Sequence, residues 1–334
     1  MNKYHSPQKK AVFSLGLLLL LLSSLIAISC GSVKISLNEI IETFLGRGSE
    51  TTRNILLFLR LPRIIEAGII GAGLAVVGAF FQGLLRNPMA DPYVLGVSSG
   101  AAFGATIAII LNLGIFGTGF SAFLAALFTI NLVYLIAKSG TRISMASLLL
   151  AGIAVSTFLS AVISLLMLLN HEQITKILFW TMGSFNLVFW DNVYLSAPLI
   201  LIGSLLLYVF ARDLNVMMTG EETAEHLGIN TEKVKRIILL LGSLVTAAAV
   251  FTTGIIGFVG LIVPHISRLL VGPDNRVLVP FSALAGAIFL ICTDTLARTI
   301  LAPAEIPAGI ITAALGAPFF IYLLIKAKTH KEGM

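Results

Sequence analysis

The sequence predicts an all-α, polytopic membrane protein with about ten transmembrane helices in a single domain, residues 1–334. Two observations carry this prediction. The 334 residues are 57% hydrophobic and 11% charged, whereas soluble globular proteins average about 45–50% apolar and about 25% charged residues. Apolar runs of about 20 residues, the length that crosses a bilayer as a helix, recur along the whole chain. Such a composition excludes a disordered chain, a disulfide-rich secreted module and a nucleic-acid-binding protein.

We place the transmembrane helices at the apolar runs between charged residues or Pro and Gly breaks. The first run follows Lys9 and Lys10 as in a signal peptide, but about 19 apolar residues exceed the usual 7–15 of such a segment, so we expect an uncleaved helix. The eighth run is short and interrupted by Pro264, which favours a half-span or a re-entrant segment. In order, the predicted spans are residues 11–30, 62–84, 93–111, 117–137, 145–169, 191–211, 236–256, 258–270, 278–298 and 306–325.

The Lys and Arg residues set the predicted orientation. With a cytoplasmic N-terminus, fifteen of the 22 basic residues fall on the inner side and seven on the outer side, as the positive-inside rule requires. An even number of spans then places both termini in the cytoplasm. The formal net charge of +6 therefore reflects topology in the cytoplasmic membrane, with lipids around the spans, rather than a nucleic-acid partner.

Small residues follow one face of the second predicted span. Gly71, Ala75, Ala79 and Gly83 recur at four-residue spacing. Helices in lipid gain little from apolar burial, so close approach of their backbones is a main source of association. We expect this ridge to pack against another helix of the same chain, and a wall of a translocation path or a dimer seam is the alternative.

The polar segment 212–235, on the predicted cytoplasmic side, contains a short acidic helix. Thr219 precedes Glu222 by three residues, which is the spacing of a capping box, and Gly228 provides a stop. Three glutamates suit the N-terminal half of a helix. They do not suit an anionic lipid surface, where amphipathic helices are usually rich in Lys and Arg. We therefore expect residues 220–227 to dock onto a protein rather than to lie on lipid.

Three arginines stand at span ends on the predicted outer side. Arg60 and Arg63 open the second span, and Arg298 closes the ninth. The residues alone leave two interpretations open. One is local pairing, such as Arg63 with Glu66 or Arg298 with Asp294, and the other is bidentate capture of carboxylates on an external partner.

Two prolines shape the segment 86–101, which joins the second and third spans. Pro88 and Pro92 end one helix and begin the next. Asn87 and Asp91 can satisfy free backbone groups at those ends. A capped loop between two helices is all that these residues indicate by themselves.

Five segments in a fixed order resemble the FecCD-type permease family of ABC importers, which are the membrane subunits for uptake of iron-siderophores, haem and cobalamin. No single segment is decisive, but five in order are highly specific, and the resemblance covers residues 10–327. The segments are R-L-P-R at 60–63, N-P-M-A-D-P-Y-V-L-G-V-S-S-G-A at 87–101, L-L-L-A-G at 148–152, G-F-V-G-L-I-V-P-H at 257–265 and E-I-P-A-G-I-I-T-A at 305–313.

The resemblance implies a type II ABC importer permease fold and a set of partners. These are a second permease copy, identical or paralogous, two cytoplasmic ATPase subunits and an extracytoplasmic substrate-binding protein. The ATPase would bind the ATP, since this chain contains no G-x-x-x-x-G-K-[ST] phosphate loop. We expect no cofactor, catalytic residue or metal ligand in the chain, and a transport subunit rather than an enzyme.

The resemblance also assigns roles to residues. Arg60, Arg63 and Arg298 match outer arginines that meet acidic residues of the binding protein, and Ser144 and Met145 match the cytoplasmic gate. The fifth span, which carries Ser, Thr and Gly among apolar residues, fits a wall of the translocation path. The helix that would couple the permease to the ATPase comprises Gly220, Glu221, Glu222, Thr223, Ala224, Glu225, His226 and Leu227.

The predicted function is ATP-driven import of an iron-siderophore complex, with haem and cobalamin left open because residues of the spans report poorly on the cargo. The alternative is an ion-coupled secondary transporter, for which Glu66, Asp191 and Asp294 are the candidate intramembrane charges. A membrane enzyme would need a cluster of acid, base or metal-binding groups at one depth, whereas the five histidines are scattered along the chain.

Overall fold

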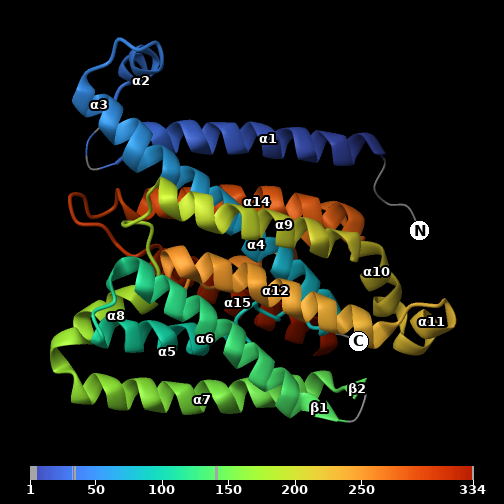
Figure 1. The fold of residues 1–334 in the computed structure, drawn as a ribbon. Helices are drawn as coiled ribbons and strands as arrows, with labels where there is room; N and C mark the ends of the chain where they lie inside the picture. The colour runs from blue at the N-terminus through green and yellow to red at the C-terminus, as the bar shows by residue number, and fades with distance from the viewer. Residues whose placement is uncertain (1–5, 32, 34, 140–141, 333–334) are drawn as a thin grey trace.

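The chain folds into a bundle of long helices, most of which run side by side (Figure 1). The computed structural model describes residues 6–332 except 32, 34, 140 and 141. In chain order the elements are α1 (Ser6–Ser29), α2 (Leu37–Phe44), α3 (Glu50–Asn54), the π-helical η1 (Ile55–Arg60), α4 (Leu61–Leu84), α5 (Val97–Ile110), α6 (Gly114–Ala137), β1 (Lys138–Ser139), β2 (Arg142–Ile143), α7 (Met145–Leu169), the 3₁₀ turn η2 (His171–Gln173), α8 (Ile174–Thr181), α9 (Trp190–Val209), α10 (Ala211–Thr219), α11 (Glu221–His226), α12 (Thr231–Thr253), α13 (Val259–Val271), α14 (Asn275–Ala297) and α15 (Ala308–Glu332).

Ten apolar helical segments overlap the ten predicted runs. Within the described residues, seven segments are long and apolar enough to cross a membrane: α1, the continuous rod α3–η1–α4, α6, α7, α9, α12 and α14. Three further apolar helices are shorter, namely α5, α13 and the first part of α15. The all-α prediction is confirmed, and the strands in the described part of the chain are the two-residue pair β1 and β2.

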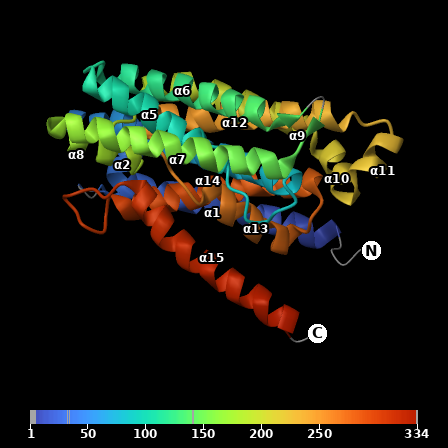
Figure 2. The same cartoon turned by 90° about the horizontal axis from the view of Figure 1, so that it is seen from below.

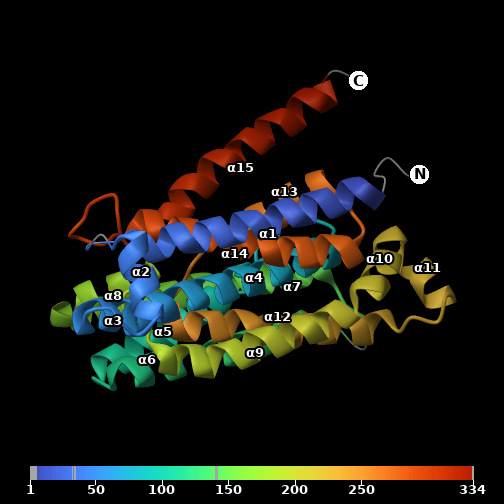
Figure 3. The ribbon, with the colours of Figure 1, turned by 90° about the horizontal axis from the view of Figure 1, so that it is seen from above.

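The two ends of the bundle differ in what they carry. The start of α1, the end of α15, the β1–β2 pair and the helices α10 and α11 gather at one end, which we call the inner end (Figures 1 and 3). Helices α2, α3 and α8 lie at the opposite, outer end. Helix α15 leans away from the other helices (Figure 2). The names follow the orientation predicted from the basic residues.

The helix of the second predicted span begins earlier than the apolar run does. The rod starts at Glu50 and passes through the π turn η1 before Pro62. In that turn the N–H of Leu61 bonds the carbonyl of Leu56, five residues back. Proline has no N–H and disturbs the normal ladder. One wide turn therefore absorbs the disturbance, and the helix continues.

The loop between α4 and α5 is capped as expected but is longer than expected. Asn87 Oδ1 accepts the N–H of Met89, and Asp91 Oδ1 accepts the N–H of Tyr93, both at 2.9 Å. These bonds confirm that the two side chains satisfy free backbone groups. Helix α5 begins only at Val97, because the residues after Pro92 form a turn instead of the first helical turn that the sequence predicted.

Helix α13 continues through Pro264, so the predicted interruption is wrong. Proline lacks the N–H that would bond the carbonyl four residues back, at Gly260. The side-chain amide of Gln82, on α4, donates to that carbonyl at 3.3 Å and to the carbonyl of Leu261 at 3.0 Å. Arg268 Nη1 donates in turn to Gln82 Oε1 at 3.0 Å. A side chain from a neighbouring helix thus replaces the bond that the proline removes.

Replacing Gln82 with Leu leaves the Gly260 carbonyl buried without a donor, and we expect the free energy of unfolding to fall by about 1–3 kcal/mol. Thermal unfolding of the purified protein in detergent measures the change. The added substitution Pro264→Ala restores a backbone N–H and should recover part of the loss. An equal loss in the single and the double variant would contradict the role assigned to Gln82.

Helix α4 lies at the centre of the bundle, and nearly all of its residues are buried. It packs against α14, α9, α12 and α13. Gly71 faces Gly286 of α14 so closely that a Cβ on either glycine would collide with the backbone of the other. Further along the ridge, Gly83 lies against Leu214 of α10. The ridge therefore packs within the chain, as the first interpretation predicted.

Gly71→Ala is expected to destabilise the protein by about 1–3 kcal/mol, because the new methyl group meets rigid backbone that cannot move aside. Gly68→Ala is the matched control one turn earlier on α4, where the added Cβ would lie 3.4 Å from Ile291 Cδ1, an ordinary contact. Thermal unfolding should show a lower melting temperature for the first variant only. Equal melting temperatures would show that the α4–α14 crossing tolerates a wider spacing.

Candidate functional sites at the two ends of the bundle

The predicted acidic helix is present at the inner end as α11, bounded by Gly220 at its N-terminus and Leu227 at its C-terminus. The predicted capping box is absent. Thr219 ends α10 and its hydroxyl donates back to Val216, because a separate helix occupies residues that the sequence suggested were loop. The stop at Gly228 is confirmed, since this residue has a positive φ of 83° and helps to close the last turn.

One face of α11 is bound to the first turns of α12. Lys235 Nζ of α12 donates to Glu221 Oε2 at 2.7 Å and to Glu232 Oε1 at 2.8 Å. One turn along the same face of α11, Glu225 Oε1 accepts the hydroxyl of Thr231 at 2.9 Å. Ala224 is fully buried between these two links. The two glutamates are therefore engaged within the chain.

The opposite face of α11 is free. The side chains of Glu222, Thr223 and His226 are exposed, and Leu227 is 68% exposed. Within the described part of the chain, no hydrogen bond or ion pair holds Glu222. Positions 222 and 226 are four apart and share a helix face. A free carboxylate and an exposed leucine, on a helix that is bound to α12 by its other face, offer a defined surface to a partner.

Helix α10 attaches this unit to the rest of the bundle. Asn215 Nδ2 donates to Asp274 Oδ1 at 2.7 Å, at the start of α14. Arg86, at the end of α4, donates to the carbonyl of Met217 at 2.7 Å. Hydrogen bonds from Arg276 and Asn215 lower the pKa of Asp274 to about 2, so this link stays ionised at neutral pH.

The predicted gate residues lie at the start of α7. The exposed Ser144 is its N-cap, and its side chain accepts the N–H of Ser147 at 3.3 Å. Met145 is half-buried against the core. The structure gives Ser144 a local capping role, and gating by either residue stays a prediction.

The outer arginines are all buried within the chain. Arg60, Arg63 and Arg298 are 5%, 8% and 3% exposed. Arg60 donates to the carbonyls of Ile28 and Val33, and Arg298 donates to the carbonyl of Ala27. The last carbonyls of a helix have no partner within it, and they attract positive charge. Two arginines from other helices therefore cap the C-terminal end of α1.

Arg63 forms the main buried ion pair of the outer end. Its guanidinium contacts both carboxylate oxygens of Asp294, with Nη2 to Oδ1 at 2.8 Å and Nε to Oδ2 at 2.9 Å. Its Nη1 bonds Glu305 Oε2 at 2.8 Å. Arg298 Nε lies 3.8 Å from Asp294 Oδ2. The predicted Arg298–Asp294 pair is thus present, whereas the predicted Arg63–Glu66 pair is wrong because Arg63 turns toward α14.

Asp294→Asn should cost about 3–5 kcal/mol of unfolding free energy, because it leaves buried guanidinium groups without their counter-charge. Glu305→Gln is the control on the same arginine, at a carboxylate that is 26% exposed, and its cost should stay below about 1 kcal/mol. Thermal unfolding in detergent ranks the two variants. If Glu305→Gln proved the more damaging, Asp294 would not be the group that balances these charges.

Glu66 instead lies in the interior between three helices. It is fully buried, and Oε1 accepts the hydroxyls of Ser196 of α9 at 2.5 Å and Thr252 of α12 at 2.8 Å. Its Oε2 atom has no hydrogen-bond partner among the described residues. Glu66 thus joins α4, α9 and α12 near the outer end.

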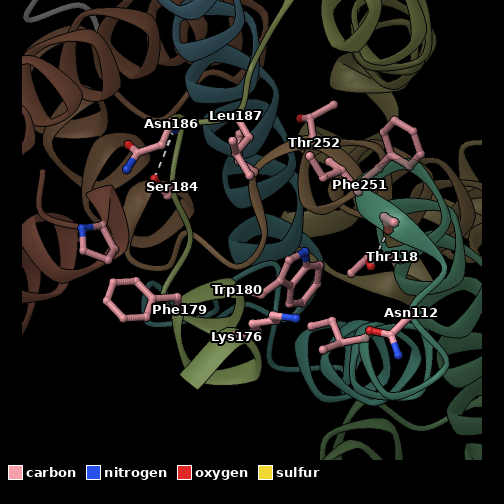
Figure 4. A pocket seen from close by; sticks show the side chains of 15 residues that line it. Asn112, Thr118, Lys176, Phe179, Trp180, Ser184, Asn186, Leu187, Phe251 and Thr252 are labelled. Carbon is pink, nitrogen blue, oxygen red and sulfur yellow. Dashed lines mark hydrogen bonds between the residues drawn. The ribbon is translucent and has the colours of Figure 1, made fainter. Parts of the chain in front are cut away.

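A pocket of about 630 Å³ opens beside this junction. Figure 4 shows Lys176 and Trp180 of α8, Phe251 and Thr252 of α12 and Asn186 around it. Most of the wall is apolar or aromatic, with one ammonium group and several amides and hydroxyls. Such a lining suits an organic molecule with a few polar or anionic groups. The sequence did not indicate this pocket, because its walls come from segments far apart in the chain.

Helix α7 is the most exposed of the long helices. An exposed stripe along it, at helical spacing, carries small or weakly polar residues together with the exposed Leu150 and Leu165. The hydroxyls of Thr157 and Ser164 bond carbonyls of their own helix, so this mixed surface is compatible with lipid, with a water-filled path and with a second protein. The small or weakly polar members of the stripe are Ser147, Ala154, Thr157, Ala161 and Ser164.

A family model described as the FecCD transport family matches residues 19–326. The chain belongs to this family. The cobalamin import system permease protein of Halobacterium salinarum is 48% identical over 82% of this chain and 74% of its own length. The hemin transport system permease protein of Yersinia pestis is 35% identical over 98% of both chains. A solved structure described as an inward-facing, metal-chelate type ABC transporter matches with a TM-score of 0.86 and 35% identity, covering 95% of this chain and 99% of that one.

Membership of the FecCD family confirms the resemblance drawn from the five segments. It also confirms the predicted fold and the predicted function as a permease subunit of an ABC importer. The chain is accordingly a multi-pass membrane transport protein. The residues that sequence reasoning missed are those of the internal links, above all Lys235, whose partner Glu221 is too distant in sequence to be recognised from spacing.

Proposed function

We propose that this permease imports a metal chelate across the cytoplasmic membrane, powered by two ATPase subunits bound at the inner end. A second permease copy completes the path, and a substrate-binding protein delivers the cargo at the outer end. The family match and the similarity to a metal-chelate type ABC transporter support this assembly. The fifteen-to-seven distribution of basic residues supports the inner end as the cytoplasmic one.

The observation that carries the coupling role is the two-sided character of α11. One face is bound to α12 by Glu221 and Glu225, and the other presents Glu222 and Leu227 to the outside. A helix that only lay on lipid would not need this attachment. A helix that receives a push from an ATPase must be held, because a loose contact would absorb the movement.

The exposed stripe on α7 supports this helix as a wall of the translocation path. A large polar chelate needs a path of small and weakly polar groups, since a strongly charged wall would hold the cargo too tightly for release. The hydroxyls of Thr157 and Ser164 donate hydrogen bonds to carbonyls of their own helix, at 2.9 Å each. They therefore present a mildly polar surface without strong binding groups.

The contact with the binding protein stays a prediction for Arg60, Arg63 and Arg298. In this structure their guanidinium groups bond within the chain. Docking through them requires these groups to leave buried partners, which costs several kcal/mol for a pair such as Arg63–Asp294. Arg47 and Arg53 are exposed at the same end and offer cations that need no such exchange.

The names of relatives include cobalamin, hemin and iron(3+)-hydroxamate import systems, so the iron-siderophore expected from the sequence stands beside cobalamin and haem. All three are metal ions in an organic shell that carries polar or anionic groups. The outer pocket, with aromatic walls and the Lys176 ammonium group, suits this class of molecule.

Reconstitution tests both the energy source and the cargo. Proteoliposomes that contain the permease, its ATPase and its binding protein should take up one of a ferric hydroxamate, haemin or cobalamin only with hydrolysable ATP. A hydrolysis-deficient ATPase is the matched control. Uptake that persists without the ATPase and stops when ionophores collapse the ion gradients would instead establish the alternative, an ion-coupled secondary transporter.

The three candidate charges of the secondary-transporter alternative lie in different surroundings. Asp294 is neutralised by Arg63, and Asp191 is exposed at the start of α9. Only Glu66 combines full burial with an oxygen that has no partner among the described residues. Glu66→Gln is therefore the variant that separates the two functions, since ATP-driven uptake should survive it and ion-driven uptake should not.

A further inference from the structure

Lys235 is a buried cation at the point where the inner helices meet. Lys235 is 2% exposed, although it lies within one turn of the exposed Lys233. A buried ammonium group is costly unless it is paired. Here it bonds Glu232 on its own helix and Glu221 on α11. The second of these ion pairs is the only charged link between α11 and α12 in the described residues.

The link joins α11 to a long, uninterrupted helix. The 23 residues of α12 contain no proline, so a displacement of its first turn is carried along the whole helix. At its outer end Thr252 bonds Glu66, and the backbone carbonyl of Thr253 accepts the N–H of Ser184 at 2.7 Å. Phe251, Thr252 and Thr253 all line the outer pocket.

We propose that Lys235 is a positioning residue through which α11 moves α12. In this arrangement Glu221 holds one face of α11 against Lys235, while Glu222 on the free face of α11 contacts the ATPase. This inference rests on the proposed function for the direction in which movement is passed. It divides the acidic residues of α11, which the sequence had treated as one docking surface, into two classes. It also connects the ATPase contact on α11 to the outer pocket through α12, which acts as one rigid element.

Two neighbouring glutamates provide a matched pair of variants. Glu221→Gln removes the charge that reaches Lys235 but leaves Lys235 paired with Glu232, so the buried ammonium group keeps a counter-charge. Glu222→Gln makes the same chemical change one residue later, on the free face. We expect Glu221→Gln to lower the cargo imported per ATP hydrolysed by about fivefold with unchanged ATPase affinity. Glu222→Gln should weaken ATPase affinity and leave that ratio unchanged.

Substitutions of Lys235 test the other partner of the link. Lys235→Arg keeps the charge and should retain most of the wild-type ratio, whereas Lys235→Met should reproduce the loss seen with Glu221→Gln. The double variant Glu221→Gln/Lys235→Met should lose no more than Lys235→Met alone, since the link between Glu221 and Lys235 is already absent in the single variant. Lys233→Met is the control for loss of a positive charge on the same turn of α12.

A second measurement uses the permease without its partners. Spin labels at His226 on α11 and Leu240 on α12, both exposed, report the distance between the helices after Cys30 and Cys292 are replaced by Ser. Glu221→Gln should broaden the distance distribution, and Glu222→Gln should not. If the proposed function failed, wild-type protein would show no ATP-driven uptake, and this distance would still decide whether the link positions α11.

Two results would overturn the inference. One is an unchanged distance distribution together with a wild-type transport ratio in Glu221→Gln, which would mean that the link positions nothing. The other is a loss of ATPase affinity in Glu221→Gln equal to that in Glu222→Gln with the distance unchanged, which would make Glu221 an ordinary contact residue.

Discussion

Polar groups at the depth of a bilayer have no water to bond, so each must find a partner inside the protein. Helices satisfy this requirement for most of the backbone, and side chains from other helices satisfy it where the ladder is broken. Gln82 bonds the Gly260 carbonyl that Pro264 leaves free. Arg60 and Arg298 bond the carbonyls at the end of α1. These bonds also fix how neighbouring helices are placed, because each joins two elements.

A buried charge needs an internal partner even more than a neutral polar group does. Charges that are paired inside the protein therefore have a structural role, and unpaired charges are candidates for binding a partner. Arg63 and Asp294 neutralise each other inside the outer end, and Lys235 is neutralised inside the inner end. A charge with no partner therefore stands out. Glu222 is exposed on α11, and this is where a partner of opposite charge gains most, because no internal bond has to be broken.

The two ends of the bundle are joined by helices that behave as stiff elements. Close contacts such as Gly71 on Gly286 leave α4 and α14 little freedom to slide, since interiors packed to this density transmit strain rather than absorb it. Helix α12 runs from the link at Lys235 to the outer pocket at Thr252. A transporter that works by tilting needs such rods.

The sequence by itself determined the fold class, the positions of ten apolar helices, the acidic helix and the family, because apolar length, helix-stop residues and ordered motifs are local properties. It placed helix ends less well. Helix α5 starts after its expected position. Helix α13 runs through Pro264 because Gln82, on a distant segment, bonds the carbonyl that the proline leaves free. Only the tertiary structure decided which charges are internal. Arg63 had carboxylates available at Glu66 and Asp294, and helix packing, which no spacing rule encodes, brought Asp294 into contact. The same packing brought Glu221 into contact with Lys235 and left Glu222 free.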